Sequence, residues 1–91
     1  MDFEWDRTKA ARNRRKHKIT FNEAATVFAD LRSSTFPDPE HSFEEDRFVT
    51  VGISERNRVL VVSHTDREDR IRIMSARKAT AQERRAYEEE I

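Results

Sequence analysis

The sequence has 91 residues, with no cysteine, one glycine, two prolines and no net charge, because 18 basic residues balance 18 acidic ones. Without cysteine, the chain forms neither a disulfide nor a thiolate zinc site. One glycine excludes, in practice, the glycine-rich loops that bind nucleotides. No apolar run approaches the ~20 residues that cross a bilayer, and no signal segment is evident. We therefore expect a cytoplasmic location and no membrane association.

Charge is unevenly distributed along this neutral chain. Residues 7–18 carry seven Lys or Arg and no acid, whereas residues 21–50 carry seven acids against two bases. Residues 70–78 again contain only cations. A chain of this kind can present separate basic and acidic faces, which suits a protein that handles phosphate and also binds another protein.

The first half of the chain predicts a short strand and two helices. Phe3 and Trp5 alternate with acids, and Asp6 is a good N-cap for a helix from Arg7 to about His17. A second helix start follows at Thr20, where Thr and Glu have the spacing of a capping box. Its apolar stripe, expected to face the sheet, consists of Ala24, Val27, Phe28 and Leu31.

The second half predicts an antiparallel meander and a final helix. Residues 33–39 contain both prolines and are expected to be irregular or an edge strand. Strands are predicted around 48–53, 59–62 and 70–74, separated by short polar turns. A second capping box at Thr80 begins a helix that runs toward the C-terminus. The prediction is one α+β domain over residues 1–91, with helices packed on a compact antiparallel sheet.

The residues that could perform chemistry are mainly cations. Arg70 and Arg72 should lie opposite Ile71 and Ile73 on their strand, where a guanidinium can bind phosphate in a bidentate manner. His64 ends the preceding strand, but the sequence does not fix whether it shares a face with Arg72. The alternative is that these arginines are solvated or paired with acids. Metal-ligand spacing is absent around the three histidines, so no metal and no cofactor are expected.

Many residues along the chain resemble the BrnT family, the toxins of type II toxin-antitoxin systems. The N-terminal part of the resemblance comprises Phe3-Glu4-Trp5-Asp6, Lys9, Asn13, Lys16, His17, Phe21, Glu23, Ala24 and Phe28. The remainder comprises His41, Glu45, Arg47, the strand 59–62, the run 72–80, Glu83, Arg84 and Tyr87. Together they cover nearly the whole chain in order.

The resemblance implies a compact fold similar to RelE-type ribonucleases and a metal-independent endoribonuclease that inhibits translation. It also implies a hetero-oligomer with a BrnA-like antitoxin, whose DNA-binding part represses the shared operon. Operator DNA would be contacted only through that antitoxin. The competing interpretation is a non-enzymatic module that binds nucleic acid or protein with the same basic face.

For a ribonuclease of this kind, we expect Arg72 and Arg77 to bind the scissile phosphate, with Arg47 assisting. His64 or Glu45 is the candidate general base or acid. Four further residues are expected to position the RNA: His17, Lys16, Lys78 and Arg70. Glu45 and Arg47 are two residues apart, so they could form either part of a site or a plain ion pair.

Overall fold

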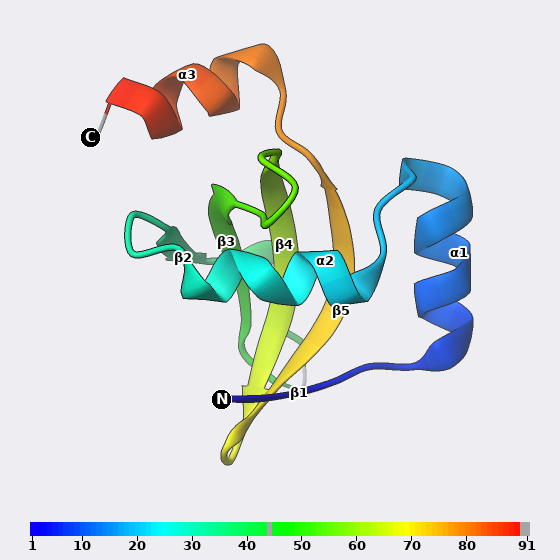
Figure 1. Cartoon of the computed structure of the whole chain (residues 1–91). Helices are drawn as coiled ribbons and strands as arrows, with labels where there is room; N and C mark the ends of the chain where they lie inside the picture. The colour runs from blue at the N-terminus through cyan, green and yellow to red at the C-terminus, as the bar shows by residue number, and fades with distance from the viewer. Residues whose placement is uncertain (44, 90–91) are drawn as a thin grey trace.

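A five-stranded β-sheet forms the centre of the molecule, with the strand order β1-β5-β4-β3-β2 (Figure 1). The computed structural model describes residues 1–43 and 45–89. Its strands are β1 (Asp2–Glu4), β2 (Ser34–Pro37), β3 (Arg47–Ile53), β4 (Val59–Arg67) and β5 (Arg70–Lys78). Its helices are α1 (Arg7–His17), α2 (Phe21–Thr26) and α3 (Ala81–Glu89), with short 3-10 turns η1 (Val27–Ala29) and η2 (Pro39–His41). Within the described residues, no helix is long and apolar enough to cross a membrane.

The pairing of the strands follows the predicted meander, with one exception. β3, β4 and β5 are antiparallel neighbours, and β2 is the edge strand expected around the prolines. β1 instead runs parallel to β5, with Phe3 opposite Ile71. The sheet is therefore mixed, because the long connection through the helices lets the chain return in the same direction.

Helix α2 crosses one side of the sheet, which we call the core face, and α1 lies beside the edge of β5 (Figure 1). Asp6 caps α1 by accepting hydrogen bonds from the Thr8 and Lys9 amides at 2.7 and 3.1 Å. The Thr20 hydroxyl accepts from the Glu23 amide at 3.1 Å, as predicted for α2. The reciprocal bond of that capping box does not form, because the Glu23 carboxylate accepts from Arg58 instead.

The apolar core fills the space between these helices and the sheet. Trp5 meets Phe21 edge to face at 5.9 Å, so it belongs to the core. Leu31 is fully exposed, contrary to the predicted stripe, because the helical backbone ends at Ala29. The fully buried cluster consists of Ile19, Phe21, Ala24, Val27, Leu60, Val62, Ile73 and Ala76.

The core-face residues of β3 become smaller along the strand, from Phe48 to Thr50 and Gly52. A Cβ on Gly52 would lie 2.9 Å from both the Val27 and the Ser33 side chains, so only glycine fits this approach of η1 to the strand. Val49 and Val51 therefore point to the opposite side of the sheet, where they are half-buried.

β5 contains a bulge at Met74. Ser63 of β4 pairs with Ser75, but His64 pairs with Ile73, so Met74 has no opposite residue. A bulge shifts the alternation of side chains by one residue. Arg72 and Arg77 are an odd number of residues apart, and the bulge is what puts both on the side of the sheet away from the core.

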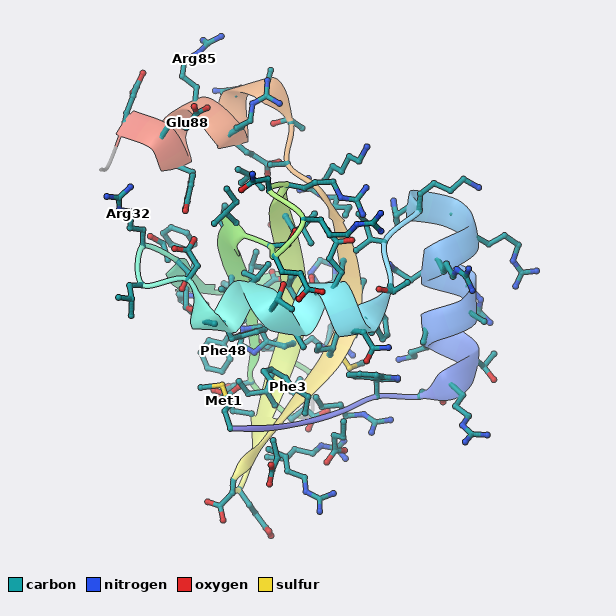
Figure 2. All side chains as sticks on the ribbon, viewed as in Figure 1. Met1, Phe3, Arg32, Phe48, Arg85 and Glu88 are labelled. Carbon is teal, nitrogen blue, oxygen red and sulfur yellow. The ribbon has the colours of Figure 1, made fainter. Side chains whose placement is uncertain are left out.

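Helix α3 lies beyond the upper ends of the strands rather than on the core face, and Arg85 extends from it away from the sheet (Figures 1 and 2). Its capping box is complete: Glu83 accepts from the Thr80 amide at 2.8 Å, and Thr80 accepts from the Glu83 amide at 3.1 Å. The Tyr87 hydroxyl donates to Asp30, which holds the second half of α3. This bond and burial raise the pKa of Tyr87 to about 12.

Asn13 joins α1 to β5. Its amide nitrogen donates to the Ala76 carbonyl at 2.8 Å and to the Ile19 carbonyl at 3.0 Å, and its amide oxygen accepts from the Ala76 amide at 3.0 Å. The side chain thus replaces a neighbouring strand at the edge of β5, beyond the point where β1 ends. Both backbone groups of the buried Ala76 thus bond to this one side chain of α1.

His64 is a buried part of the core face. Its ring lies 4.9 Å from Phe28 and 5.9 Å from Phe48, its Nε2 is 2.8 Å from Thr50 Oγ1, and its Nδ1 is 3.1 Å from Asp66. Burial lowers the pKa of His64, and the contact with Asp66 offsets only part of that effect.

We predict that Asn13→Ala lowers the free energy of unfolding by about 2–4 kcal/mol, because it leaves buried backbone groups without partners. Urea unfolding measures the change. Asn22→Ala, at an exposed position of α2, is the matched control and should change stability by less than about 0.5 kcal/mol. Equal losses in the two variants would contradict the role of Asn13.

We also predict that stability falls as the pH is lowered from about 7 to about 5. Burial lowers the pKa of His64 in the folded state, so the unfolded chain takes up a proton there first, as the pH falls below about 6.5. Urea unfolding at several pH values should show that His64→Gln flattens this slope and that His41→Gln, at an exposed position, retains it. An unchanged slope in His64→Gln would refute the assignment.

Candidate nucleic-acid interface

The side of the sheet opposite α2, which we call the open face, carries most of the predicted site residues. Strand register places Arg47, Thr65 and Arg72 in one row across β3, β4 and β5. Ser63 and Ser75 share the next row, and Val61 and Arg77 the one after it. Rows two residues apart are about 6.6 Å apart, so Arg72 and Arg77 start about 13 Å from each other.

One half of the open face is a cavity of about 520 Å³ below α3. Its floor is apolar and is formed by Val49, Val51 and Val61. Aromatic and polar side chains surround that floor: His17, Phe36, Asp38, Ser63, Ser75, Arg77, Glu83 and Tyr87. The mixture of an apolar floor and a few polar groups is typical of a ligand site.

Arg77 is fixed at the wall of this cavity by Glu83. The two parallel hydrogen bonds between guanidinium and carboxylate measure 2.8 and 3.0 Å. The bonds from Arg77 and from the Thr80 amide lower the pKa of Glu83 to about 2. The same pair raises the pKa of Arg77, so both groups are charged and their charges cancel.

The other half of the open face holds a group of charged residues that we call the arginine–glutamate cluster: Glu4, Glu45, Arg47, Arg67, Arg70 and Arg72. Arg72 donates to Glu4 at 2.8 Å. Arg67 donates twice to Glu45 at 3.2 Å, and these bonds lower the pKa of Glu45. The guanidinium of Arg47 makes no ion pair with a described residue. With four cations and two carboxylates, the cluster keeps a net positive charge.

Thr65 lies in the middle of this half. It stands between Arg47 and Arg72 in the strand register, and it is completely buried. Among the described residues, its hydroxyl has no hydrogen-bond partner. A buried hydroxyl without a partner, on a threonine that pairs with two arginines in the strand register, is the kind of exception that marks functional sites.

The structure thus divides the predicted site residues into three locations. Arg47, Glu45, Arg72 and Arg70 meet in the arginine–glutamate cluster. Arg77 and His17 lie at the cavity. His64 lies on the core face, where a substrate bound to the open face does not reach it.

The positions of the remaining candidates follow from α1 and the end of β5. Lys16 lines a groove of about 220 Å³ between α1 and β5 with Lys9, Arg12, Met74 and Ser75. Lys78 is exposed at the end of β5, opposite Leu60. Glu45 and Arg47 do not form the ion pair that their spacing offered, because Glu45 turns to Arg67.

Several residues of the open face carried no sequence signal as site residues. Ser63, Thr65 and Ser75 are isolated hydroxyls in strands, and only the register brings them beside the arginines. Glu83 was predicted as a helix cap, and its second partner, Arg77, comes from tertiary structure. Glu4 belongs to the N-terminal part of the family resemblance. Its contact with Arg72 depends on the parallel pairing of β1.

Metal binding has no evident site in the described part of the chain. No group of three or more His, Asp or Glu residues lies close enough together there to hold an ion. The histidines are separated: His17 is at the cavity, His41 pairs with Asp38, and His64 is in the core.

Comparison with known proteins gives a family and a fold. The family model described as the ribonuclease toxin BrnT of type II toxin-antitoxin systems matches residues 5–83. No curated protein matches the chain. Among solved structures, the 1.1 Å crystal structure of the Brucella abortus ribonuclease toxin BrnT is similar, with a TM-score of 0.69 and 22% sequence identity. The match covers 88% of this chain and 97% of the Brucella chain.

The family match spans β2 to β5, α1, α2 and the first residues of α3, and the structural match reproduces the α+β fold over 88% of this chain. The chain belongs to the BrnT family of ribonuclease toxins of type II toxin-antitoxin systems.

Proposed function

We propose that this chain is an endoribonuclease that cleaves RNA on the open face of its sheet without using a metal ion. The observation that carries the proposal is the row Arg47–Thr65–Arg72, where the strand register sets two arginines on either side of a threonine whose buried hydroxyl has no partner among the described residues. Guanidinium groups match the geometry and the charge of a phosphate. A family of ribonuclease toxins supplies the reaction, and this row supplies a place for the phosphate.

The proposed reaction is an internal transesterification. The ribose 2′-oxygen forms a bond to the adjacent phosphorus, and the bond from phosphorus to the 5′-oxygen of the next nucleotide breaks. A base takes the proton of the 2′-hydroxyl, and an acid gives a proton to the departing 5′-oxygen. The products are a 2′,3′-cyclic phosphate and a 5′-hydroxyl end.

Arg72 and Arg47 hold the scissile phosphate in this scheme. Preorganised donors aimed at a developing oxyanion are each worth about 3 kcal/mol of barrier lowering. Arg72 exchanges its bond with Glu4 for the phosphate, and the exchange costs little because partly exposed ion pairs contribute only about 0–1 kcal/mol. Arg77 lies about 13 Å along the strands and contacts a neighbouring part of the RNA backbone.

Glu45 is the group that we assign to proton transfer. Of the two sequence candidates, it is the one beside the arginines of the open face, whereas His64 is on the core face. The hydrogen bonds from Arg67 lower the pKa of Glu45, so its carboxylate is ionised at neutral pH and can accept the 2′-hydroxyl proton. His17, Lys16, Lys78 and Arg70 position the RNA around this centre.

Mapping the ends of cleaved RNA tests the reaction. Total RNA incubated with the protein should acquire 2′,3′-cyclic phosphate and 5′-hydroxyl ends, equally with and without EDTA. Arg72→Gln and Arg47→Gln should each reduce the cleavage rate by about 100-fold. Arg85→Gln, an exposed position on α3, is the control with the same change of charge and should retain the rate.

Three results would oppose this proposal. Fragments that end in a 3′-hydroxyl would exclude attack by the 2′-oxygen, and loss of cleavage in EDTA would exclude a metal-independent reaction. RNA binding with no cleavage at any protein concentration would favour the non-enzymatic module.

The type II toxin-antitoxin family implies a protein antitoxin as the partner. We propose that it is BrnA-like, that operator DNA is bound through it, and that the toxin acts on translation in the cytoplasm when it is released. Residues 38–46 carry five acids in the sequence and include Phe43, which is 87% exposed, so this segment and α3 are the proposed contact region.

The antitoxin should cover the arginines of the open face. We predict that an arginine-selective dicarbonyl reagent, read by mass spectrometry, modifies Arg72 and Arg77 in the free toxin but not in the complex. Arg56, exposed in the turn between β3 and β4, should react equally in both states. Unchanged reactivity of Arg72 and Arg77 in the complex would refute masking of the open face.

A further inference from the structure

We propose that single-stranded RNA reaches the open face along the groove between α1 and β5 and places one base in the cavity below α3. α1 then binds the phosphates on one side of that base, and the arginine–glutamate cluster binds those on the other side. This inference rests on the proposed ribonuclease function and specifies how its substrate lies on the protein.

The groove has a cationic wall. Lys9, Arg12 and Lys16 lie at positions i, i+3 and i+7 of α1, so their side chains share one face of the helix. They line the groove of about 220 Å³ whose opposite wall is Met74 and Ser75 of β5. Asn13 lies between them and is bonded to Ala76, which fixes this face of α1 against the strand.

The groove-lining cations of α1 lack the ion pairs that most arginines of the sheet make. Among the described residues, the ion-paired arginines are Arg58, Arg67, Arg70, Arg72, Arg77 and Arg84. Lys9, Arg12 and Lys16 form no ion pair with a described carboxylate. A row of cations without acidic partners is the electrostatic footprint of a phosphate backbone.

The groove opens directly into the cavity. His17 and Ser75 line both of them, His17 at the C-terminal end of α1 and Ser75 directly after the bulge. A chain that leaves the cationic wall at Lys16 passes the edge of β5 at Ser75 and reaches the cavity beside His17 and Arg77, without crossing the core face.

The cavity suits a base better than a phosphate. Its floor of valines is apolar, and the charge of its arginine is cancelled by Glu83. Phe36 and Tyr87 stand at its rim and offer ring faces or edges to a flat ligand, while Ser63 and Ser75 offer hydroxyls for its polar edge. Aromatic side chains and a few hydrogen-bonding groups are how proteins bind unstacked bases.

The same features select single strands. In a duplex the bases are stacked and paired, so none of them can enter a cavity without first leaving the helix. A single strand can turn one base inward and leave its backbone along the cations on both sides. An acidic protein segment would bind the cations of the groove. It would not account for a cavity with an apolar floor and aromatic side chains.

Binding measured separately from cleavage tests this path. The probe is a fluorescent ten-nucleotide 2′-O-methyl oligoadenylate, which has no free 2′-hydroxyl and cannot be cleaved by the proposed reaction. The full chain is titrated with this probe at several salt concentrations. A self-complementary 2′-O-methyl duplex and a strand with abasic positions in place of the adenines are the comparison ligands.

The first pair of variants removes three positive charges from each side of α1. Lys9→Gln/Arg12→Gln/Lys16→Gln should weaken binding of the single strand at least tenfold and reduce the slope of log K against log salt by about 2. Arg7→Gln/Arg14→Gln/Arg15→Gln removes the same charge from exposed positions outside the groove and should leave most of the slope in place. Both retain Asn13 and should unfold at similar urea concentrations.

The second pair of measurements tests the base site. Phe36→Ala, at a half-exposed position on the edge strand, should weaken binding of oligoadenylate by on the order of tenfold. It should have no effect on the abasic strand, because that strand has no base to place in the cavity. The wild-type protein should bind the duplex more weakly than the single strand.

Equal losses from the two α1 variants, or equal binding of the duplex and the single strand, would overturn the path. A loss in Phe36→Ala that is the same for the abasic strand would overturn the base site. Both results would leave the ribonuclease proposal intact if the wild type still cleaves RNA. Absence of cleavage together with the expected binding pattern would instead refute the proposed function and keep the path.

Discussion

The bulge at Met74 is the feature on which the open face depends. In a regular strand, residues 72 and 77 point to opposite sides, and the arginine that follows Ala76 would enter the core. The bulge moves Ser75 and Arg77 to the side of Arg72 and leaves Ile73 and Ala76 in the core. Beyond the bulge, the edge of β5 has no partner strand, and Asn13 supplies the missing hydrogen bonds. The same irregularity therefore places both Arg77 and α1.

The pairing of charges separates two kinds of cation in a chain with no net charge. Most arginines of the open face are oriented by carboxylates, as Arg72 is by Glu4 and Arg77 by Glu83, whereas Arg47 has no ion pair with a described residue. Such pairs fix the direction of a guanidinium before a substrate arrives, so that less side-chain entropy is lost on binding. The cations of the α1 groove have no such partners, and they attract an anion over a longer range instead. Carboxylates thus orient most arginines of the sheet, while the cations of α1 attract the anion, and the two roles are complementary.

The sequence predicted the elements well because their signals are local. Asp6 and Thr80 cap helices as expected, and β4 is central as its apolar run indicated. The exposure of Leu31, the parallel β1 and the inward-facing Thr50 depend on contacts between distant segments, so no local pattern contained them. For the site, alternation correctly placed Arg70 and Arg72 opposite Ile71 and Ile73. Arg77 entered by resemblance to a family, because alternation alone puts it on the other face. Only the pairing register of the strands shows that the His64 side chain lies on the core face.

The two faces of the sheet use their polar groups in opposite ways. On the core face, Glu23 is bonded to Arg58 and Ser54, and His64 to Thr50, so each buried group has a partner and contributes to a rigid interior. On the open face, the Thr65 hydroxyl has no partner among the described residues, and valines floor a cavity of about 520 Å³. A buried hydroxyl without a partner and an exposed apolar floor are both unfavourable, and a stable fold can retain them where a ligand binds. The rigid core face therefore allows the open face to remain incomplete until a nucleic acid or an antitoxin binds there.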